Sequence, residues 1–255
     1  MKYYLAEACQ NTFVLFDCLD APRLEPDFLQ KAHAILLQED RDDAMILTDS
    51  RVQGDTLYMR MVVLGIDSAF GEFCGNGARA CAAYLFEHYP AYHHFSLVTP
   101  WGHHPLAQKE AGLYSITLPF PSFRLNPKFI TQLPTGFHFA EMIEPHLIMQ
   151  AAISDEQLFD IGKTLNQERE HFPLGINVNA WHVMDDQTIF VKTYERGVQR
   201  LTKSCGTGST SCAAFHKKRG TCTVVTPGGS LQFLLKEREI VMTGPACVSN
   251  MALEN

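Results

Sequence analysis

The stretch CGNGARACAA, at residues 74–83, has a near copy, CGTGSTSCAA, at residues 205–214. Each copy begins with Cys-Gly-x-Gly, continues to a second cysteine and ends in a pair of alanines. Further along the chain, VTPWG at 98–102 is matched by VTPGG at 225–229. Two landmarks that recur in the same order indicate that one structural unit is written twice.

The elements predicted around the two copies also match. Alanine-rich stretches with helical spacing follow the glycines, at 77–88 and 208–218, and two further helices are predicted at 26–38 and 155–167. Short aromatic or β-branched runs predict strands at 11–17, 57–64, 95–99, 113–119, 177–183, 188–194, 221–226, 230–235 and 239–243. We therefore expect an α/β (α+β) fold with two pseudo-symmetric halves, each a mixed barrel-like β-sheet around a central α-helix.

The boundary between the halves is predicted from proline content. Prolines recur through residues 119–136, which is typical of a linker. The expected domains are an N-terminal half, 1–118, to which the final residues 245–255 return, and a C-terminal half, 119–244. Each half then carries one copy of the cysteine motif.

Composition narrows the class of protein. The 255 residues are 46% apolar, enough for one large core or two small ones. The net charge of −7 argues against a nucleic-acid partner. The N-terminus lacks the apolar core of a signal peptide, and no apolar run is long enough for a membrane span. We expect a cytoplasmic protein without a membrane partner.

Eight cysteines are present, and their context favours free thiols. Without a secretory signal, disulfides are not expected. No two cysteines show the C-x-x-C spacing of a structural zinc site, so no metal is expected. Six of the eight are expected to be small core residues. Cys74 and Cys205 differ because they begin the duplicated motif.

A cysteine directly before a helix lies at the positive end of the helix dipole, where the first backbone N–H groups lack partners within the helix. Both effects favour the thiolate, so the pKa of each motif thiol is expected to fall below the usual value of about 8.5. Glycines let a ligand reach the backbone N–H groups directly. Each motif therefore predicts an activated thiol beside an anion site.

Two such sites together fit one reaction, the inversion of an amino acid at its α-carbon. A base must remove the weakly acidic α-proton from one face while an acid delivers a proton to the other. One thiolate and one thiol can exchange these roles with the direction of reaction. Donors already in place would stabilise the charge that develops on the carboxylate, so no cofactor is needed.

At these residues the sequence resembles the diaminopimelate epimerases, which are racemases that do not use pyridoxal phosphate. The resemblance runs over nearly the whole chain. It is carried by the first motif, by YERGV at 194–198 with Thr202 and the second motif, and by TPGG at 226–229 and TGPA at 243–246. Asn11 and the pair NV at 177–178 agree as well.

The resemblance implies roles for particular residues. Cys74 and Cys205 would be the acid/base pair, with Glu195 near Cys205 and His146 near Cys74. The substrate's reacting end and its more distant end would be bound by Gly75, Asn76, Gly206, Thr207, Asn11, Asn177 and Arg196. A homodimer is also implied. The active site would lie in a cleft between the halves.

Departures from the family pattern fall on the residues expected around the far end of diaminopimelate. RDDAM at 41–45 replaces a glycine-containing loop, and Gly65 and Glu144 stand where the family has asparagines. Ala44, Gly65 and Glu144 would therefore alter the distal pocket. A carboxylate at Glu144 would repel a distal carboxylate and suit a cationic side chain. The expected substrate is a basic amino acid such as histidine, lysine, ornithine or arginine.

Three alternatives remain open at this point. The alternatives to a racemase of basic amino acids are a diaminopimelate epimerase proper, an isomerase of the same fold that uses a single acid/base group, and a non-catalytic protein that binds an amino acid. The paired cysteines argue against the single-group isomerase, whose relatives generally lack them. Exchange of the α-hydrogen with solvent deuterium discriminates an enzyme from a binding protein.

Overall fold

The computed structural model describes residues 1–21, 24–249 and 252–253. The chain forms two compact units, the first comprising Met1–Thr117 with Thr243–Asn255 and the second comprising Leu118–Met242. Of the C-terminal residues expected to return to the first half, 250–251 and 254–255 lie outside the described part. Each unit is described by itself below.

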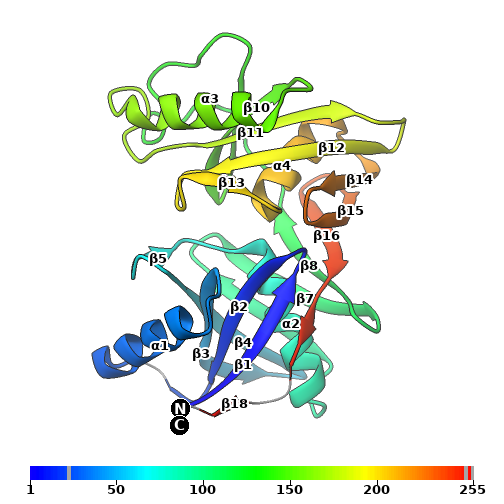
Figure 1. The fold of residues 1–255 in the computed structure, drawn as a ribbon. Helices are drawn as coiled ribbons and strands as arrows, with labels where there is room; N and C mark the ends of the chain where they lie inside the picture. Colours follow the sequence, from blue (N-terminus) through cyan, green and yellow to red (C-terminus); the bar gives the residue numbers. More distant parts are fainter. Residues whose placement is uncertain (22–23, 250–251, 254–255) are drawn as a thin grey trace. The chain divides into compact units, whose positions relative to one another are not determined.

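Unit 1 is a mixed sheet in which two parallel pairs alternate with antiparallel hairpins (Figure 1). Its strands are β1 (Lys2–Ala8), β2 (Asn11–Cys18), β3 (Asp43–Gln53), β4 (Thr56–Gly65), β5 (Phe70–Gly71), β6 (His94–Thr99), β7 (Gly102–Glu110) and the start of β8 (Leu113–Pro119). Strands β2 and β3 are parallel, and so are β4 and β6. Parallel neighbours need a crossover, and α1 (Pro26–Gln38) and α2 (Gly75–His88) supply the two crossovers.

Two short strands near the end of the chain pair within unit 1. Strands β17 (Cys247–Val248) and β18 (Ala252–Leu253) both pair antiparallel with β1.

Unit 2 repeats the same order of pairings. Its strands are β9 (His138–Met142), β10 (Glu144–Gln150), β11 (Asn177–Val183), β12 (Thr188–Glu195), β13 (Arg200–Thr202), β14 (Gly220–Thr226), β15 (Gly229–Leu235) and the start of β16 (Glu239–Pro245). The pair β10–β11 is parallel and so is β12–β14, with α3 (Asp155–Gln167) and α4 (Gly206–His216) as crossovers. The expected fold of two pseudo-symmetric α/β halves is confirmed.

The second repeated landmark forms the same hairpin in both units. In unit 1 the Thr99–Gly102 pair closes the turn between β6 and β7, and in unit 2 the Thr226–Gly229 pair closes the turn between β14 and β15. In each turn the threonine hydroxyl donates to the glycine carbonyl. Both glycines have positive φ, 126° and 138°, which side chains rarely allow. The repeated residues therefore encode the same hairpin turn in both units.

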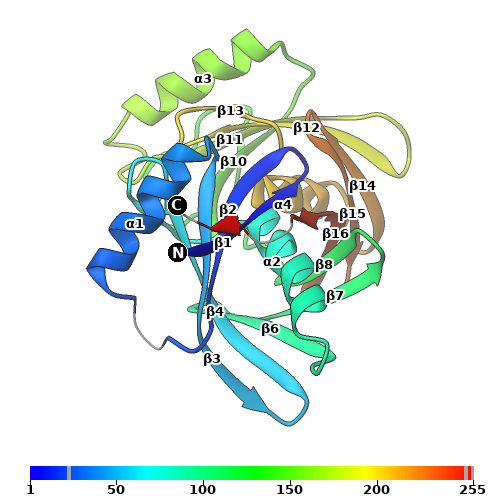
Figure 2. The ribbon, with the colours of Figure 1, turned by 60° about the horizontal axis from the view of Figure 1, so that its bottom comes forward.

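The two motif helices, α2 and α4, are the central helices of their units. Helix α2 contacts β1, β2, β3, β6, β7 and β17, and α4 contacts β9, β10, β11, β12, β14 and β15. Figure 2 shows α2 surrounded by strands of its own unit. Nearly every residue from Gly75 to Leu85, and from Gly206 to Ala214, is buried. The alanines, glycines and serines of both motifs suit burial on all sides, because they allow strands to approach closely.

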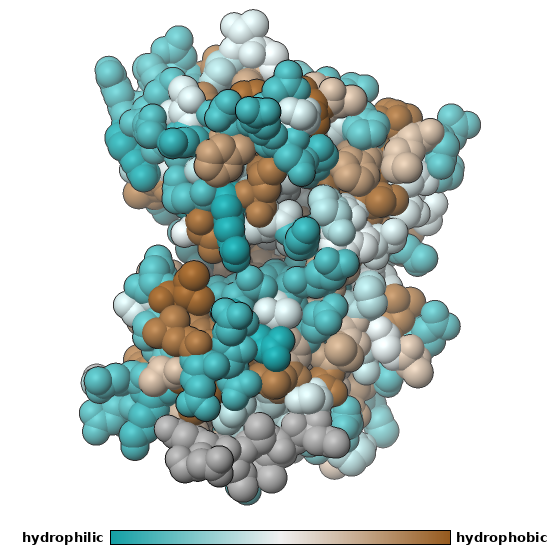
Figure 3. Space-filling model, in the orientation of Figure 1, coloured by the Kyte–Doolittle hydropathy of each residue, from teal (hydrophilic) through white to brown (hydrophobic). Residues whose placement is uncertain are grey.

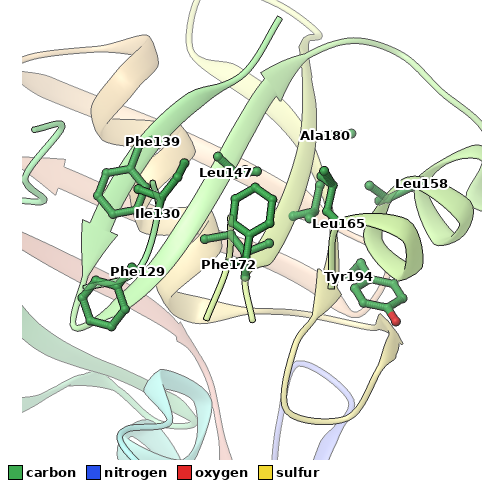
Figure 4. Close-up of a cluster of buried hydrophobic side chains, with 11 residues drawn as sticks. Phe129, Ile130, Phe139, Leu147, Leu158, Leu165, Phe172, Ala180 and Tyr194 are labelled. Atoms are coloured by element: carbon green, nitrogen blue, oxygen red, sulfur yellow. The ribbon is translucent and has the colours of Figure 1, made fainter. Parts of the chain in front are cut away.

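The other two helices cover the outside of a sheet with one apolar face. Helix α1 buries Ala32, Ile35 and Leu36 against β2 and β3. Helix α3 buries Leu158 and Leu165 in the cluster drawn in Figure 4. Its Gly162 lies against the Tyr194 ring, which an added Cβ would overlap. The small residue therefore sets how closely α3 approaches β12.

The stretch expected as a linker has a second role. Residues 120–137 form no named strand, but Phe129 and Ile130 are buried in the same cluster as Leu158 (Figure 4). The proline-rich stretch is therefore part of the core of unit 2.

Several strands carry no alternating pattern of their own and were not expected from the sequence, among them β1, β3, β7, β9 and β10. RDDAM, expected as a loop, is instead the entry to β3, which begins at Asp43. In β3 and β10 several consecutive residues are buried, so packing on both faces explains the lack of alternation there. On the face drawn in Figure 3, hydrophobic side chains are scattered among hydrophilic ones.

Candidate active site

Cys74 is the N-cap of α2, and its sulfur is part of the cap. The Gly77 N–H donates to Cys74 Sγ at 3.2 Å, so the sulfur binds one of the otherwise unpaired donors of the first turn. The side chain is partly exposed. A Cβ at Gly77 would overlap the Met45 sulfur, so this glycine allows the close packing of α2 against β3.

A chain of hydrogen bonds runs from the first turn of α2 to the β1–β2 hairpin and the start of β3. Arg79 Nη2 donates to Asn76 Oδ1 at 2.8 Å, and Asn76 Nδ2 donates to Asn11 Oδ1 at 3.3 Å. Asn11 Nδ2 in turn donates to Asp42 Oδ2 at 3.1 Å. Unit 1 therefore brings Cys74, Asn76 and Asn11 together, as expected. Arg79 and Asp42 were not expected to belong to this network.

Cys205 is the N-cap of α4, but its surroundings differ from those of Cys74. Its side chain is buried, at 7% exposure. Burial and the carboxylates of Glu195 and Glu144 raise the pKa of the Cys205 thiol well above its usual value, although Thr207 and the Gly208 N–H oppose the shift. The expectation of a lowered pKa is therefore wrong for this thiol. Two negative charges and burial outweigh the helix N-terminus.

Glu195 ends β12 and is oriented by the neighbouring strand. Thr202 Oγ1, on β13, donates to Glu195 Oε1 at 2.6 Å. The electrostatic effect of Glu195 on Cys205 agrees with the expected proximity of this pair. Gly206 and Thr207 form the first turn of α4, with Thr207 Oγ1 3.5 Å from Cys205 Sγ.

Asn177, expected to bind substrate, has every polar atom of its side chain bonded within unit 2. Its Nδ2 donates to Glu144 Oε2 at 3.1 Å and to the Pro145 carbonyl at 3.2 Å, and its Oδ1 accepts from the Arg196 N–H at 3.0 Å. Arg196 Nη1 donates to the Leu174 carbonyl at 3.1 Å. Asn177 therefore fixes the carboxylate of Glu144 and the backbone N–H of Arg196, the residue that follows β12.

His146 lies on β10 and is fully buried. Burial and the nearby Arg196 guanidinium lower its pKa to about 3, so the ring is neutral at neutral pH. Its Nδ1 is 3.2 Å from Asn179 Nδ2, and among the described residues Nε2 has no hydrogen-bond partner. His146 and Cys74 belong to different units, and their expected pairing stays a prediction.

Asn179 is a site residue that the sequence analysis missed. Its Nδ2 donates to the Leu147 carbonyl at 2.9 Å, and its Oδ1 accepts from Thr193 Oγ1 at 2.8 Å. A Cβ at Gly208 would overlap that same Oδ1, so Asn179 supports the first turn of α4. The available signal was its spacing, because Asn177 and Asn179 are two apart on one strand and point to the same face.

The three positions assigned to a distal pocket have different surroundings, each within its own unit. Ala44 has no exposed surface and packs with Ile35 and Leu36 of α1, so its assignment to the pocket is wrong. The alternation of β3 explains this, because Ala44 faces α1 while Met45 faces α2. Gly65 forms a turn closed by a hydrogen bond to the Ala69 carbonyl. The carboxylate of Glu144 is close enough to Cys205 to raise the pKa of its thiol.

The residues that the structure describes contain no group of three or more His, Cys, Asp or Glu side chains able to hold a metal ion. Within the same residues, no helix is long and apolar enough to cross a membrane.

Comparison with known proteins gives a consistent family. The diaminopimelate epimerase family model matches residues 141–248. The diaminopimelate epimerase of Thermotoga maritima is 31% identical over 182 residues, covering 70% of this chain and 73% of the relative. That of Methanothrix thermoacetophila is 28% identical over 256 residues, covering 92% and 89%.

A solved structure shares the fold at low identity. The hydroxyproline epimerase of Agrobacterium vitis superposes with a TM-score of 0.69 at 13% identity, covering 99% of this chain and 90% of that one. Together with the duplicated motif and its two helix starts, the matches show that this chain belongs to the diaminopimelate epimerase family.

Proposed function

We propose that this protein is a cofactor-independent amino-acid racemase or epimerase that inverts the α-carbon with Cys74 and Cys205 as its two acid/base groups. One observation carries the proposal. The two cysteines are the N-caps of the central helices, at topologically equivalent places in the two units.

In this mechanism the substrate carboxylate is bound by backbone N–H groups in the first turns of the helices, at Gly75 and Asn76 and at Gly206 and Thr207. These donors stabilise the negative charge that develops when the α-proton leaves. The C–H bond breaks as its proton passes to the thiolate, and the thiol gives its proton to the opposite face of the carbon. One thiol and one thiolate remain, with their roles exchanged.

The different surroundings of the two thiols support a resting enzyme in which one thiol is protonated and the other is a thiolate. Burial and the carboxylates of Glu195 and Glu144 favour a protonated Cys205, which is the state of the acid. Cys74 accepts the Gly77 N–H, which favours a thiolate and therefore the base. The resting enzyme then deprotonates the enantiomer whose α-hydrogen faces Cys74.

Glu144 supports a substrate with a cationic side chain. Its carboxylate is fixed by Asn177 and is close enough to Cys205 to raise that thiol's pKa. A second carboxylate on the substrate would be repelled there, and an ammonium, guanidinium or imidazolium group would be attracted. We propose histidine, lysine, ornithine and arginine as the first substrates to test.

A second candidate is diaminopimelate itself. The relatives at 28–31% identity carry the name diaminopimelate epimerase. The ratio of kcat/KM for diaminopimelate to that for each basic amino acid decides between the candidates. A tenfold advantage of diaminopimelate would establish the second and exclude the first.

The test of the chemistry itself is exchange of the α-hydrogen in deuterium oxide, followed by NMR together with optical rotation. The wild type is expected to exchange and racemise its substrate, whereas Cys74→Ala and Cys205→Ala lose racemisation while remaining folded. Cys81→Ala is the matched control. This thiol lies two turns further along α2 and is fully buried, so its loss acts through packing only, at roughly 1 kcal/mol.

Two results would overturn the proposal. Near-normal racemisation by either single variant would exclude the two-thiol mechanism. Binding of an amino acid by the wild type without any α-exchange, across the basic amino acids and the diaminopimelate isomers, would favour a binding protein of the same fold.

A further inference from the structure

A fully buried guanidinium lies beside the first turn of α2. Arg79 has no exposed surface, although it belongs to the central helix of its unit. Helical side chains tilt toward the N-terminus, so its head group reaches back along the helix. Nη1 donates to the Gly75 carbonyl at 3.4 Å, and Nη2 donates to Asn76 Oδ1 at 2.8 Å and to Cys9 Sγ at 3.4 Å.

A buried cation is costly unless an anion compensates it. Arginine does not escape by losing its proton, because its pKa stays far above neutral pH. Burial lowers the pKa of Arg79 from its ordinary value, and the neighbouring thiol groups of Cys9 and Cys74 oppose that shift. A thiolate at either cysteine therefore meets a positive charge. Of the two, Cys74 is the one that begins the helix and is partly exposed.

The second copy of the motif has no charged residue at the position equivalent to Arg79. The residue five positions after Cys205 is Thr210, as Arg79 is five positions after Cys74. Thr210 Oγ1 donates to the Gly206 carbonyl at 2.8 Å, which repeats the Arg79 bond to Gly75 without a charge. The thiol of unit 2 is instead surrounded by carboxylates. The duplicated motif thus has a positive charge in one copy and none in the other.

We propose that Arg79 is a positioning residue for the Cys74 half of the reaction. Its charge stabilises the thiolate form of Cys74, and its hydrogen bonds fix the first turn of α2 and Asn76. This inference rests on the proposed function for its catalytic meaning. The effect of Arg79 on the ionisation of Cys74 can be measured without turnover.

Other titratable groups face α2 from the elements packed against it. Asp42 reaches the helix start through Asn11 and Asn76, and His104 of β7 contacts the Phe73 ring just before Cys74. Burial lowers the pKa of His104, so this ring is neutral near pH 7. At the other end of the helix Tyr84 donates to Asp17 and stacks on His88. Arg79 is therefore the cation expected to control Cys74 near pH 7.

The experiment measures alkylation by iodoacetamide against pH, with Cys74 and Cys205 followed separately by mass spectrometry of their peptides. Four proteins are compared: wild type, Arg79→Met, Arg79→Lys and the matched control Thr210→Val. In Arg79→Met the midpoint for Cys74 is expected to rise by about one pH unit, a tenfold loss of rate below the midpoint. Arg79→Lys keeps the charge and restores most of the shift, and Thr210→Val leaves Cys74 unchanged.

An unchanged Cys74 midpoint in a folded Arg79→Met protein would overturn the proposal. If that variant does not fold, the wild type alone still decides, because Cys74 must react at a lower pH than Cys205. Equal midpoints, or a lower one for Cys205, would overturn it. A Cys74 profile that depends on Arg79 in a protein without racemase activity would instead refute the proposed function and leave this inference standing. In an active enzyme, the acid limb of the kcat/KM profile should move with the alkylation midpoint.

Discussion

Asn177 Nδ2 donates to Glu144 Oε2 at 3.1 Å, across the parallel pair β10–β11. The same amide nitrogen also donates to the Pro145 carbonyl. A buried amide therefore holds the carboxylate that stands where the resemblance implies an asparagine. Glu144 also raises the pKa of Cys205, so its negative charge acts on the thiol that is proposed to react.

The substrate preference should follow the charge at Glu144. Glu144→Asn removes that charge and introduces the residue that the resemblance implies at this position. We expect the ratio of kcat/KM for diaminopimelate to that for lysine to rise about tenfold or more, since one close charge pair is worth about 1 kcal/mol or more. Glu144→Gln is the control, because it keeps the chain length and an acceptor for Asn177. Equal changes in both substrates would show that the carboxylate does not select between them.

The ionisation of Cys205 should depend on Glu195. The negative charge of Glu195 disfavours the thiolate, so Glu195→Gln should lower the pKa of Cys205 and move its alkylation midpoint to lower pH. Thr202→Val is a useful companion, because it keeps the charge and removes only the 2.6 Å bond that orients it. The prediction fails if the midpoint stays in place in Glu195→Gln.

The two motif glycines should tolerate a methyl group differently. In Gly77→Ala the new Cβ overlaps the Met45 thioether, which can adopt another rotamer, so we expect a loss of about 1 kcal/mol. In Gly208→Ala it overlaps Asn179, which is tied to Leu147 and Thr193. Here we expect about 3 kcal/mol, since a buried polar network must break. Urea unfolding measures both, and equal losses would contradict the assigned rigidity of Asn179.

His146 should make unit 2 sensitive to acid. Its folded pKa of about 3 lies below the ordinary value of about 6.5, so between these values the unfolded chain binds a proton that the folded chain does not. The stability is present above about pH 6.5 and is lost as the pH falls toward 3, by up to about 1.4 kcal/mol per pH unit.

His146→Gln should flatten this dependence in denaturant melts from pH 7 to pH 4. His93→Gln, which changes an exposed ring, is the matched surface control. An identical slope in His146→Gln and the wild type would show that another group carries the acid sensitivity.

Much of the fold was predictable because its signals are local. The helices 26–38 and 155–167 were predicted at the bounds found in the structure, since each has a start signal and one apolar face. Strands such as 177–183 were predicted from β-branched and aromatic runs. Strands β3 and β10 were not, because burial of consecutive residues on both faces removes the alternation that identifies a strand.

The sequence by itself determined the duplicated architecture and the place of the two thiols. The reason is that a helix start, a two-residue hairpin turn and a small-residue helix are each encoded by adjacent residues. Only the tertiary structure decided which distant groups join them. Cys9 accepts from Arg79 in one unit and Glu144 acts on Cys205 in the other, and in both cases the two segments are far apart in the chain. The two copies of the motif therefore differ in their electrostatic surroundings for two reasons. Arg79 and Thr210 differ within the motif itself, and the elements packed around each sulfur add further charges such as Glu144.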